Sequence, residues 1–449
     1  MKYQFDLIVV GTGAGGSIAA NKCRQAGWRV AMIDSRPFGG TCALRGCDPK
    51  KVLVGVAELI DHLDRMKGKG IVGDAHIDWR ELMQFKNTFT EPVPSQREQG
   101  MVKSGIKTFH GRARFSDSNT LQVRDESLTG NYILLANGAR PATLNIPGED
   151  HLSSSDQFLE LETLPKRILF AGGGYISFEF AHIAARAGAD AQILHRGARP
   201  LEGFDVDLVD RLLARTKAIG IDVHLHTELI AVNKQGESLA IHANENGREQ
   251  TYTADMVVHG AGRVPDLDDM DLEKGGVKHE QRGVTVNQYL QSVTNPSVYA
   301  AGDAAATPGL PLTPVGGVES RIAAANMLEG NHREIEYPAM PTVVFTTPVL
   351  ASVGLREDQA RDQGLTFETH HEDISGWYAS RRVAERCAAY KVLVESDSDR
   401  ILGAHLLGPH AEEVINLFAM AITYGLTGKE IKKMIFAYPT NASDLGYMV

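Results

Sequence analysis

The chain has 449 residues and a formal net charge of −10, with 43% hydrophobic and 23% charged residues. This length exceeds a single core and predicts about three domains. The acidic balance disfavours nucleic acid and anionic membranes as partners. No apolar run reaches the roughly 18 residues of a membrane span, and the first run, Leu7–Val10, is too short for a signal peptide. We therefore expect a cytoplasmic protein with no nucleic-acid or membrane partner.

Two segments of the chain follow the same plan of strand, glycine turn, helix and strand. The first begins with the strand Asp6–Val10 and ends at Asp34, and the second begins with Arg167–Ala171 and ends at His195. In both, the last residue lies 23 positions after the first glycine of the turn. This arrangement predicts two βαβ units that bind dinucleotides. The alternative is a pair of glycine-rich loops in another α/β fold.

Three positions of each turn have a defined role in such a unit. The first makes the tight turn, the second lets the backbone approach a pyrophosphate, and the third packs the helix against the strand. The amides at the helix N-terminus then face the pyrophosphate charge. The residues at these positions are Gly11, Gly13 and Gly16 in the first unit, and Gly172, Gly174 and Ser177 in the second.

The residue that ends each unit is placed to contact the adenosine ribose. Asp34 can accept hydrogen bonds from ribose hydroxyls, which suits FAD or NAD and repels a 2′-phosphate. The second unit has His195 there, followed by Arg196, with Arg199 nearby. A missing carboxylate and an added guanidinium favour the 2′-phosphate of NADPH. The alternative is that both arginines are solvated loop charges.

The rest of the chain indicates an α/β protein with two Rossmann-like domains and a C-terminal α+β domain. Two further strand-like runs, Tyr132–Ala136 and Ser297–Ala301, end at glycines where ligands approach a parallel sheet. From about Tyr337 the pattern changes to strands followed by helices. We expect an FAD domain in two parts (residues 1–145 and 267–336), a nicotinamide domain (146–266) and an interface domain (337–449).

Two of the four cysteines stand close together in a glycine-flanked segment, Gly39–Lys50. Cys42 and Cys47 are five residues apart and would diverge by roughly 140° on an ideal helix. They can meet if the glycines distort the start of a helix, where the dipole also stabilises a thiolate. No further Cys/His pair follows to complete a metal site, so we expect none. The alternative is a pair of buried structural thiols.

These motifs, with Gly262–Pro265, Ala301–Asp303 and Leu312–Val315, resemble the pyridine nucleotide-disulfide oxidoreductases such as glutathione reductase, dihydrolipoyl dehydrogenase and mercuric reductase. The resemblance implies that FAD binds the first unit and the nicotinamide binds the second. It implies a homodimer in which Cys47 contacts the flavin and Cys42 attacks the acceptor. Further roles implied in cofactor binding or beside the flavin fall to Thr41, Lys50, Tyr175, Glu179, Arg263, Asp303 and Thr313.

The C-terminal segment departs from that family. Where disulfide reductases have an acid/base histidine, this chain has Tyr438, and an unperturbed tyrosine titrates near about 10. Mercuric reductases also have tyrosine there, but their C-terminal cysteine pair is absent here. The acceptor therefore stays open between a disulfide that does not need histidine, a soft metal ion and a quinone. A non-catalytic flavoprotein, such as a redox sensor, is the alternative of a different class.

Overall fold

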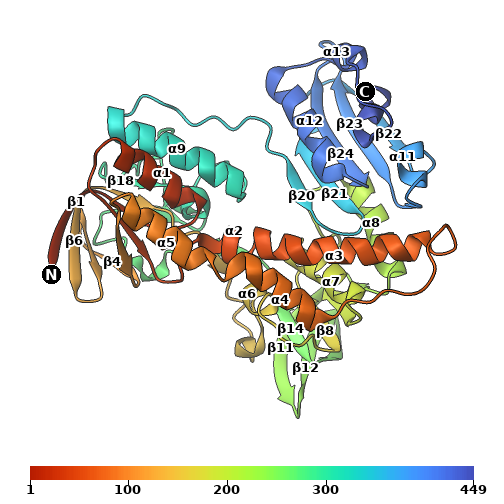
Figure 1. Ribbon diagram of the computed structural model, residues 1–449, viewed down its shortest axis with the longest axis horizontal. Coiled ribbons are helices and arrows are strands. Elements are labelled where there is room, and N and C mark those ends of the chain that lie inside the picture. The colour runs from red at the N-terminus through yellow and green to blue at the C-terminus, as the bar shows by residue number, and fades with distance from the viewer. The chain divides into compact units, whose positions relative to one another are not determined.

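The computed structural model describes Met1–Val449 and divides the chain into two compact units, each assembled from several segments (Figure 1). The first unit comprises Met1–Lys50, Phe85–Ala142 and Arg263–Tyr337. The second comprises Lys51–Gln84, Thr143–Gly262 and Pro338–Val449. The three domain boundaries expected from the sequence stay predictions.

The first unit is built on a seven-stranded sheet of order β3-β2-β1-β6-β5-β4, in which β18 also pairs with β6. Its strands are β1 (Lys2–Val10), β2 (Val30–Asp34), β3 (Lys107–His110), β4 (Ala113–Asp117), β5 (Thr120–Val123), β6 (Glu126–Leu135) and β18 (Val298–Ala300). Smaller sheets contain β7 (Ala139–Pro141), β15 (Arg263–Pro265), β16 (His279–Glu280), β17 (Gly283–Thr285) and β19 (Ala305–Ala306). The helices are α1 (Ala14–Gln25), α2 (Gly40–Arg45), α5 (Val93–Lys103), α9 (Thr313–Glu329), η2 (Asp268–Met270) and η3 (Gly302–Ala304). Two helices, α3 (Cys47–Met66) and α4 (Trp79–Thr90), continue from one unit into the other along the chain.

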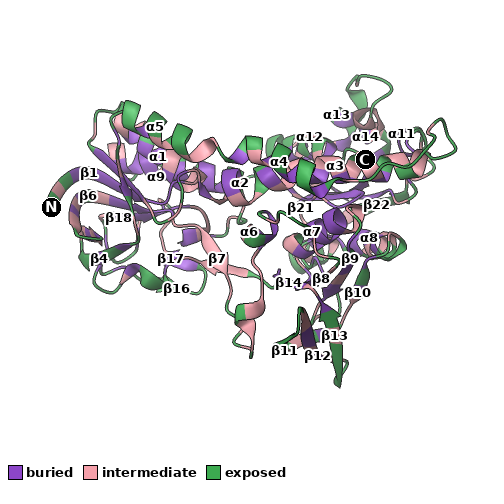
Figure 2. Cartoon of the chain, turned by 60° about the horizontal axis from the view of Figure 1, so that its bottom comes forward, coloured by how far each residue is buried: buried purple, intermediate pink, exposed green.

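Both faces of the central sheet are buried, as expected for parallel strands covered on two sides (Figure 2). Successive residues of β1 alternate between two core clusters, with Ile8 and Val10 in one and Leu7 and Val9 in the other. The second cluster includes small residues of α1 and α9, which lie side by side (Figure 1). This packing brings the N-termini of both helices to the carboxyl ends of the strands.

The second unit contains a parallel sheet of order β10-β9-β8-β14 and an antiparallel C-terminal sheet of order β20-β21-β24-β23-β22. The strands of the parallel sheet are β8 (Arg167–Ala171), β9 (Asp190–Leu194), β10 (Asp222–His224) and β14 (Met256–His259). A separate three-stranded meander contains β11 (Thr227–Gln235), β12 (Ser238–Glu245) and β13 (Arg248–Ala254). The helices of this part are η1 (Glu149–His151), α6 (Ser155–Phe158), α7 (Tyr175–Arg186) and α8 (Val206–Ala218). The C-terminal part comprises β20 (Thr342–Val344), β21 (Val349–Gly354), α10 (Glu357–Asp362), β22 (Phe367–Asp373), α11 (Tyr378–Arg381), β23 (Ala389–Glu395), β24 (Ile401–Gly408), α12 (Ala411–Tyr424), α13 (Gly428–Lys433), η4 (Asn441–Asp444) and α14 (Leu445–Met448).

The structure contains both βαβ units and the C-terminal α+β arrangement that the sequence predicts. The meander β11–β13 and the helices α4 and α5 were not anticipated. The edge strands β11 and β13 of the meander carry many exposed polar residues, which hides the strand pattern. No helix of the chain has the length and apolar character needed to span a membrane.

Candidate functional site

The first glycine turn forms a backbone cradle at the N-terminus of α1. Gly11 has a φ of 103°, and a Cβ there would run into the carbonyl of Ala136. A Cβ on Gly40, which has a φ of 75°, would collide with the backbone of Gly13. Gly13 is the N-cap of α1 and no side chain caps the helix. Glycine alone fits these close approaches, and the uncapped helix N-terminus suits the pyrophosphate of FAD.

Asp34 is held in position at the end of β2 by three hydrogen bonds. Its Oδ2 accepts from the backbone nitrogen of Thr12 at 3.0 Å and from the Thr12 hydroxyl at 2.6 Å. Its Oδ1 accepts from the nitrogen of Arg36 at 2.9 Å. The Thr12 hydroxyl also accepts from Gly39, so Thr12 ties the turn, the β2 end and the cysteine segment together. Sequence reasoning missed Thr12, which occupies an unspecified position of the glycine pattern.

The two cysteines meet because the helix that carries them is broken, as the glycines predict. The short helix α2 ends before Gly46, and α3 begins at Cys47. A Cβ on Gly46 would lie 3.1 Å from the carbonyl oxygen of Thr41 and 3.5 Å from the Cα of Cys42. Glycine there lets the two helix ends approach. Both thiols are free in this structure, and each shifts the pKa of the other.

The electrostatics of the pair are asymmetric. The hydrogen bond from Cys42, supported by the Thr313 hydroxyl and the Lys50 charge, lowers the pKa of Cys47 to about 6. The Thr313 Oγ1 lies 3.6 Å from the Cys47 sulfur. The same bond to Cys47, together with burial, raises the pKa of Cys42. Because Cys47 opens α3 and Thr313 opens α9, the N-termini of two helices meet at one thiol, where their dipoles favour a thiolate.

A buried carboxylate that sequence reasoning missed connects the turn containing Asp303 to α9. Glu319 is 1% exposed and accepts hydrogen bonds from the nitrogen of Gly302 at 2.6 Å and from the hydroxyls of Thr307 at 2.8 Å and Tyr337 at 2.6 Å. Burial raises the pKa of Glu319 and also that of Asp303. Glu319 therefore fixes the loop beside Asp303 relative to the helix that begins at the thiol pair.

Arg263 lies in the first unit with Asp303. Its guanidinium donates to the carbonyl oxygen of Ala139 at 2.5 Å, and its charge opposes the burial that raises the pKa of Asp303. The residues of this unit at the ends of the strands and at the N-termini of α1 and α9 thus fit FAD. The chemistry that FAD supplies when bound is transfer of electrons from a nicotinamide to the thiol pair.

The second glycine turn repeats the geometry of the first in the second unit. Gly172 has a φ of 110°, and a Cβ there would collide with the carbonyl of Gly260. Gly174 is the N-cap of α7, again without a side-chain cap. Ser177, at the third position, is fully buried, and its hydroxyl has no hydrogen-bond partner in the structure. Gly260 lies against that hydroxyl, so the close packing is achieved from the opposite strand.

The loop after β9 presents positive charge to solvent. His195 Nε2 is 2.9 Å from the carbonyl oxygen of Arg199, so the imidazole points toward the backbone of the same loop. The side chains of Arg196 and Arg199 are exposed, and neither forms an ion pair in this structure. Both guanidinium groups are therefore available to an anionic group beside the second glycine turn.

Tyr175 and Glu179 lie on α7, at the same end of the helix. The Tyr175 hydroxyl is 2.5 Å from the Thr342 hydroxyl, and its ring stacks edge-on against Phe204. Burial raises the pKa of Tyr175, although 39% of the residue is exposed. Glu179 is buried and accepts from the nitrogen of Phe345 at 3.0 Å. Lys50 belongs to the first unit, and its pairing with Glu179 stays a prediction.

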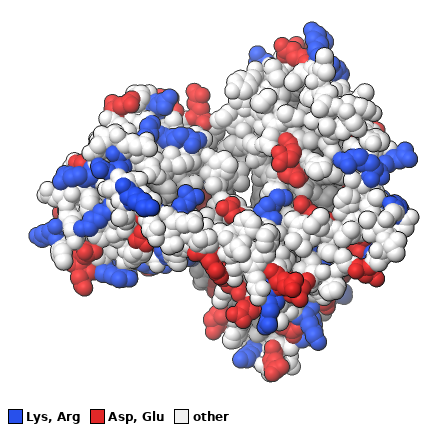
Figure 3. All heavy atoms as spheres, in the orientation of Figure 1, with Lys and Arg blue, Asp and Glu red and all other residues white.

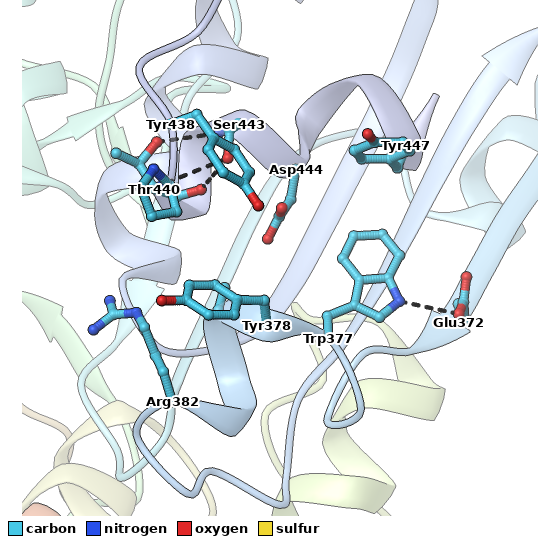
Figure 4. A pocket seen from close by; sticks show the side chains of 11 residues that line it. Glu372, Trp377, Tyr378, Arg382, Tyr438, Thr440, Ser443, Asp444 and Tyr447 are labelled. Carbon is cyan, nitrogen blue, oxygen red and sulfur yellow. Dashed lines mark hydrogen bonds between the residues drawn. The ribbon is translucent and has the colours of Figure 1, made fainter.

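Tyr438 lines a pocket of about 520 Å³ in the C-terminal part of the second unit. Figure 4 shows Tyr438, Tyr378 and Asp444 directed into this pocket, with Arg382 at its edge. Tyr438 is 82% exposed, whereas burial raises the pKa of Asp444. The full lining is Glu372, Trp377, Tyr378, Ala379, Arg382, Tyr438, Pro439, Thr440, Ser443, Asp444 and Tyr447, with no histidine among them.

Family comparisons agree with this geometry. Residues 5–327 match the model of the pyridine nucleotide-disulphide oxidoreductase family, and residues 340–448 match the dimerisation domain of the same family. The chain belongs to the pyridine nucleotide-disulphide oxidoreductase family. It is an oxidoreductase of the flavin disulfide reductase type, and its family implies FAD and a nicotinamide as cofactors.

Relatives similar to this chain include glutathione reductases and mercuric reductases. Glutathione reductase of Burkholderia cepacia is 32% identical over 446 residues (99% of this chain and 98% of the relative), and mercuric reductase of Staphylococcus aureus is 30% identical over 447 residues (98% and 81%). An uncharacterised 19.7 kDa protein in the mercuric resistance operon of Staphylococcus aureus is 53% identical over 180 residues, 40% of this chain and all of that protein. The Cu(II) complex of the HOCl-induced flavoprotein disulfide reductase RclA from Escherichia coli matches with a TM-score of 0.89 and 26% identity, covering 99% of this chain and 98% of that one.

Proposed function

We propose that this protein is an NADPH-dependent reductase that passes electrons through FAD to Cys42 and Cys47, and from Cys42 to a thiophilic metal ion. The observation that carries this proposal is the thiol pair: a stabilised Cys47 thiolate at two helix N-termini, hydrogen-bonded to Cys42. Such a pair exchanges between dithiol and disulfide, and the thiolate is the reactive form. A purely structural flavoprotein would not need this asymmetry, and turnover of NADPH with an acceptor distinguishes an enzyme from a redox sensor.

The two thiols have different roles in the proposed reaction. Cys42 binds the metal ion as a thiolate, and the Cys47 sulfur lies 3.6 Å from the Thr313 Oγ1. With Cu(II) as acceptor, the dithiol and two Cu(II) ions give the disulfide, two Cu(I) ions and two protons. Bound FAD would supply the two electrons from NADPH that reduce the disulfide, and Thr313 and Lys50 would stabilise the Cys47 thiolate.

The acceptor side supports a metal ion over glutathione disulfide. Disulfide exchange needs a leaving thiolate, which an acid normally protonates, and general acid catalysis contributes typically about 10²–10⁴-fold. The pocket that contains Tyr438 has no histidine to supply that proton. A metal ion leaves no alkyl thiolate behind. The 53% identical relative comes from a mercuric resistance operon, and RclA has been solved with Cu(II), although glutathione reductases are also relatives.

NADPH is the proposed electron donor because the loop after β9 carries exposed, unpaired arginines where an NAD-binding unit would have a carboxylate. Arg196 follows directly after His195, which turns away into the loop. A guanidinium binds phosphate through charge-assisted hydrogen bonds. We assign the 2′-phosphate to Arg196, with Arg199 as a second contact.

A homodimer is the proposed assembly. The C-terminal part matches the family's dimerisation domain and exposes large apolar side chains: Met420 (50%), Tyr424 (76%), Met434 (48%) and Ile435 (100%). Figure 3 shows few charged side chains on the near face of the part that carries α12. Exposed apolar patches of this kind mark protein interfaces.

The test is steady-state oxidation of saturating NADPH by the holoenzyme with Cu(II), Hg(II), glutathione disulfide and a quinone. We expect the metal ions to support turnover and glutathione disulfide to be slow. Cys42→Ser should abolish metal reduction, whereas Cys387→Ser, which removes a cysteine outside the pair, should retain it. Glutathione disulfide turnover at about 10 per second or more, typical of median enzymes, would contradict the proposed acceptor.

A further inference from the structure

One carboxylate lies directly beside the thiol pair. Asp48 follows Cys47 in the first turn of α3 and its side chain is exposed. Its Oδ1 lies 4.0 Å from the sulfur of Cys42. Lys50 acts on the Cys47 side of the pair, whereas the charges that act on Cys42 are the Cys47 thiolate and Asp48, both negative. The attacking thiol therefore faces a negative environment.

This placement is unfavourable for an ordinary disulfide reductase. The Asp48 carboxylate raises the pKa of both thiols and so reduces the fraction of attacking thiolate. It also repels an anionic acceptor such as a carboxylate-bearing disulfide. Only a cationic acceptor gains from the carboxylate on its approach to Cys42. A carboxylate in the first turn also stabilises a helix, but that effect does not depend on the charge of the acceptor.

We propose that Asp48 is a specificity-determining residue that selects positively charged acceptors at Cys42 and rejects anionic ones. This proposal extends the proposed function and rests on one part of it: Cys42 is the thiol that reacts with the acceptor. A unit charge roughly 6 Å from the carboxylate in a water-like dielectric changes a rate about two- to threefold. The ratio of rates for a matched cation and anion should therefore change about three- to tenfold when the Asp48 charge is removed.

The test uses the full-length holoenzyme with Cys47→Ser, which leaves Cys42 as the thiol of the pair. It is treated with two methanethiosulfonates that differ only in carrying a trimethylammonium or a sulfonate group. The Cys42 thiolate forms a disulfide with the reagent's thioalkyl group and displaces methanesulfinate, and the thiol proton goes to solvent. Because both reagents react with the same thiolate, its fraction cancels in the ratio of the two rates. Modification at Cys42 is followed by mass spectrometry.

Asp48→Asn should lower the cation-to-anion ratio about three- to tenfold, and Asp48→Lys should lower it further. Asp48→Glu should keep the ratio, and Asp117→Asn, which removes an exposed carboxylate from β4, should not change it. Salt at 1 M should reduce the difference, since the Debye length falls to about 3 Å.

An unchanged ratio in Asp48→Asn, or equal acceleration of both reagents, would overturn the proposal, because the carboxylate would then affect only the thiol pKa or the helix. Flavin content of each variant reports folding, and Asp48→Lys, which also removes the carboxylate, maintains the comparison if Asp48→Asn is unstable. The reactions use neither NADPH nor a metal ion, so failure of metal reduction leaves this result unaffected.

Discussion

The contact between Thr313 and Cys47 gives a quantitative prediction about thiolate stability. Replacing Thr313 by valine keeps the side-chain volume but removes the hydroxyl that lies 3.6 Å from the Cys47 sulfur. A hydrogen bond to a charged group is worth about 1.5–3 kcal/mol, and this long contact belongs at the lower end. One pKa unit corresponds to about 1.36 kcal/mol, so the pKa of Cys47 should rise by about one unit from its value of about 6.

The assay is the rate of Cys47 alkylation by iodoacetamide between about pH 5 and 9, in a Cys42→Ser background that keeps a hydroxyl donor beside Cys47. Burial raises the pKa of Cys23 and of Cys387 to about 12, so neither reacts appreciably in this range. Because a lowered pKa means that the thiolate is present above it, the rate should rise through about pH 6 with Thr313 and through about pH 7 with valine.

Thr313→Ser is the matched control, since serine retains the hydroxyl at the N-terminus of α9. Its profile should stay close to that of the parent. If the valine and serine variants titrate together, the Thr313 hydroxyl does not stabilise the thiolate, and the helix dipoles with Lys50 must account for it. A shift in both variants would point instead to a displaced α9.

Three further predictions concern the cofactors and stability. Gly40→Ala should release FAD, because the added Cβ would collide with the first glycine turn. Gly55→Ala should retain FAD, since a Cβ there would meet nothing within 4 Å. Flavin absorbance of each variant after gel filtration measures the FAD that stays bound. Arg196→Glu should lower the NADPH-to-NADH ratio of kcat/KM by roughly 10- to 150-fold, and equal efficiency in the wild type would refute the phosphate assignment. Burial lowers the pKa of His182 to about 3 from 6.5, so the unfolded chain takes up the proton first and stability falls as the pH drops below 6.5. We expect a loss of about 2 kcal/mol from this residue at pH 5, measured by urea unfolding, and His182→Gln should show a smaller drop than the wild type.

The parts of the fold that the sequence predicts well are those where glycine is the only residue that fits. Gly11 and Gly172 each occupy a left-handed conformation against a neighbouring carbonyl, and that requirement is visible in the sequence without any knowledge of the partner strand. The broken helix at the thiol pair is predictable for the same reason, since Gly46 separates two helical stretches. These are local backbone requirements, and local sequence specifies them.

The residues that the sequence does not predict act through partners far along the chain. Glu319 lies in the middle of α9, where the sequence pattern predicts an ordinary solvated charge. In the structure it is buried and accepts hydrogen bonds from Gly302, Thr307 and Tyr337. No local pattern marks such a carboxylate, because its partners come from a turn, a loop and the end of the unit. Thr12 is similar, since its role appears only when β2 brings Asp34 beside it.

The proposed donor and acceptor sides of the thiol pair differ in the kind of residues on which they depend. The donor side, from the glycine turns to Thr313, depends on backbone approach and helix N-termini, which tolerate few changes. The proposed acceptor side involves exposed side chains, Asp48 beside Cys42 in the first unit and Tyr438 at its pocket in the second. An exposed side chain can be exchanged at little cost in stability, typically within about 0.5 kcal/mol. We therefore propose that relatives such as the 30% identical mercuric reductase of Staphylococcus aureus can keep one electron path while exchanges at exposed positions such as Asp48 alter the acceptor.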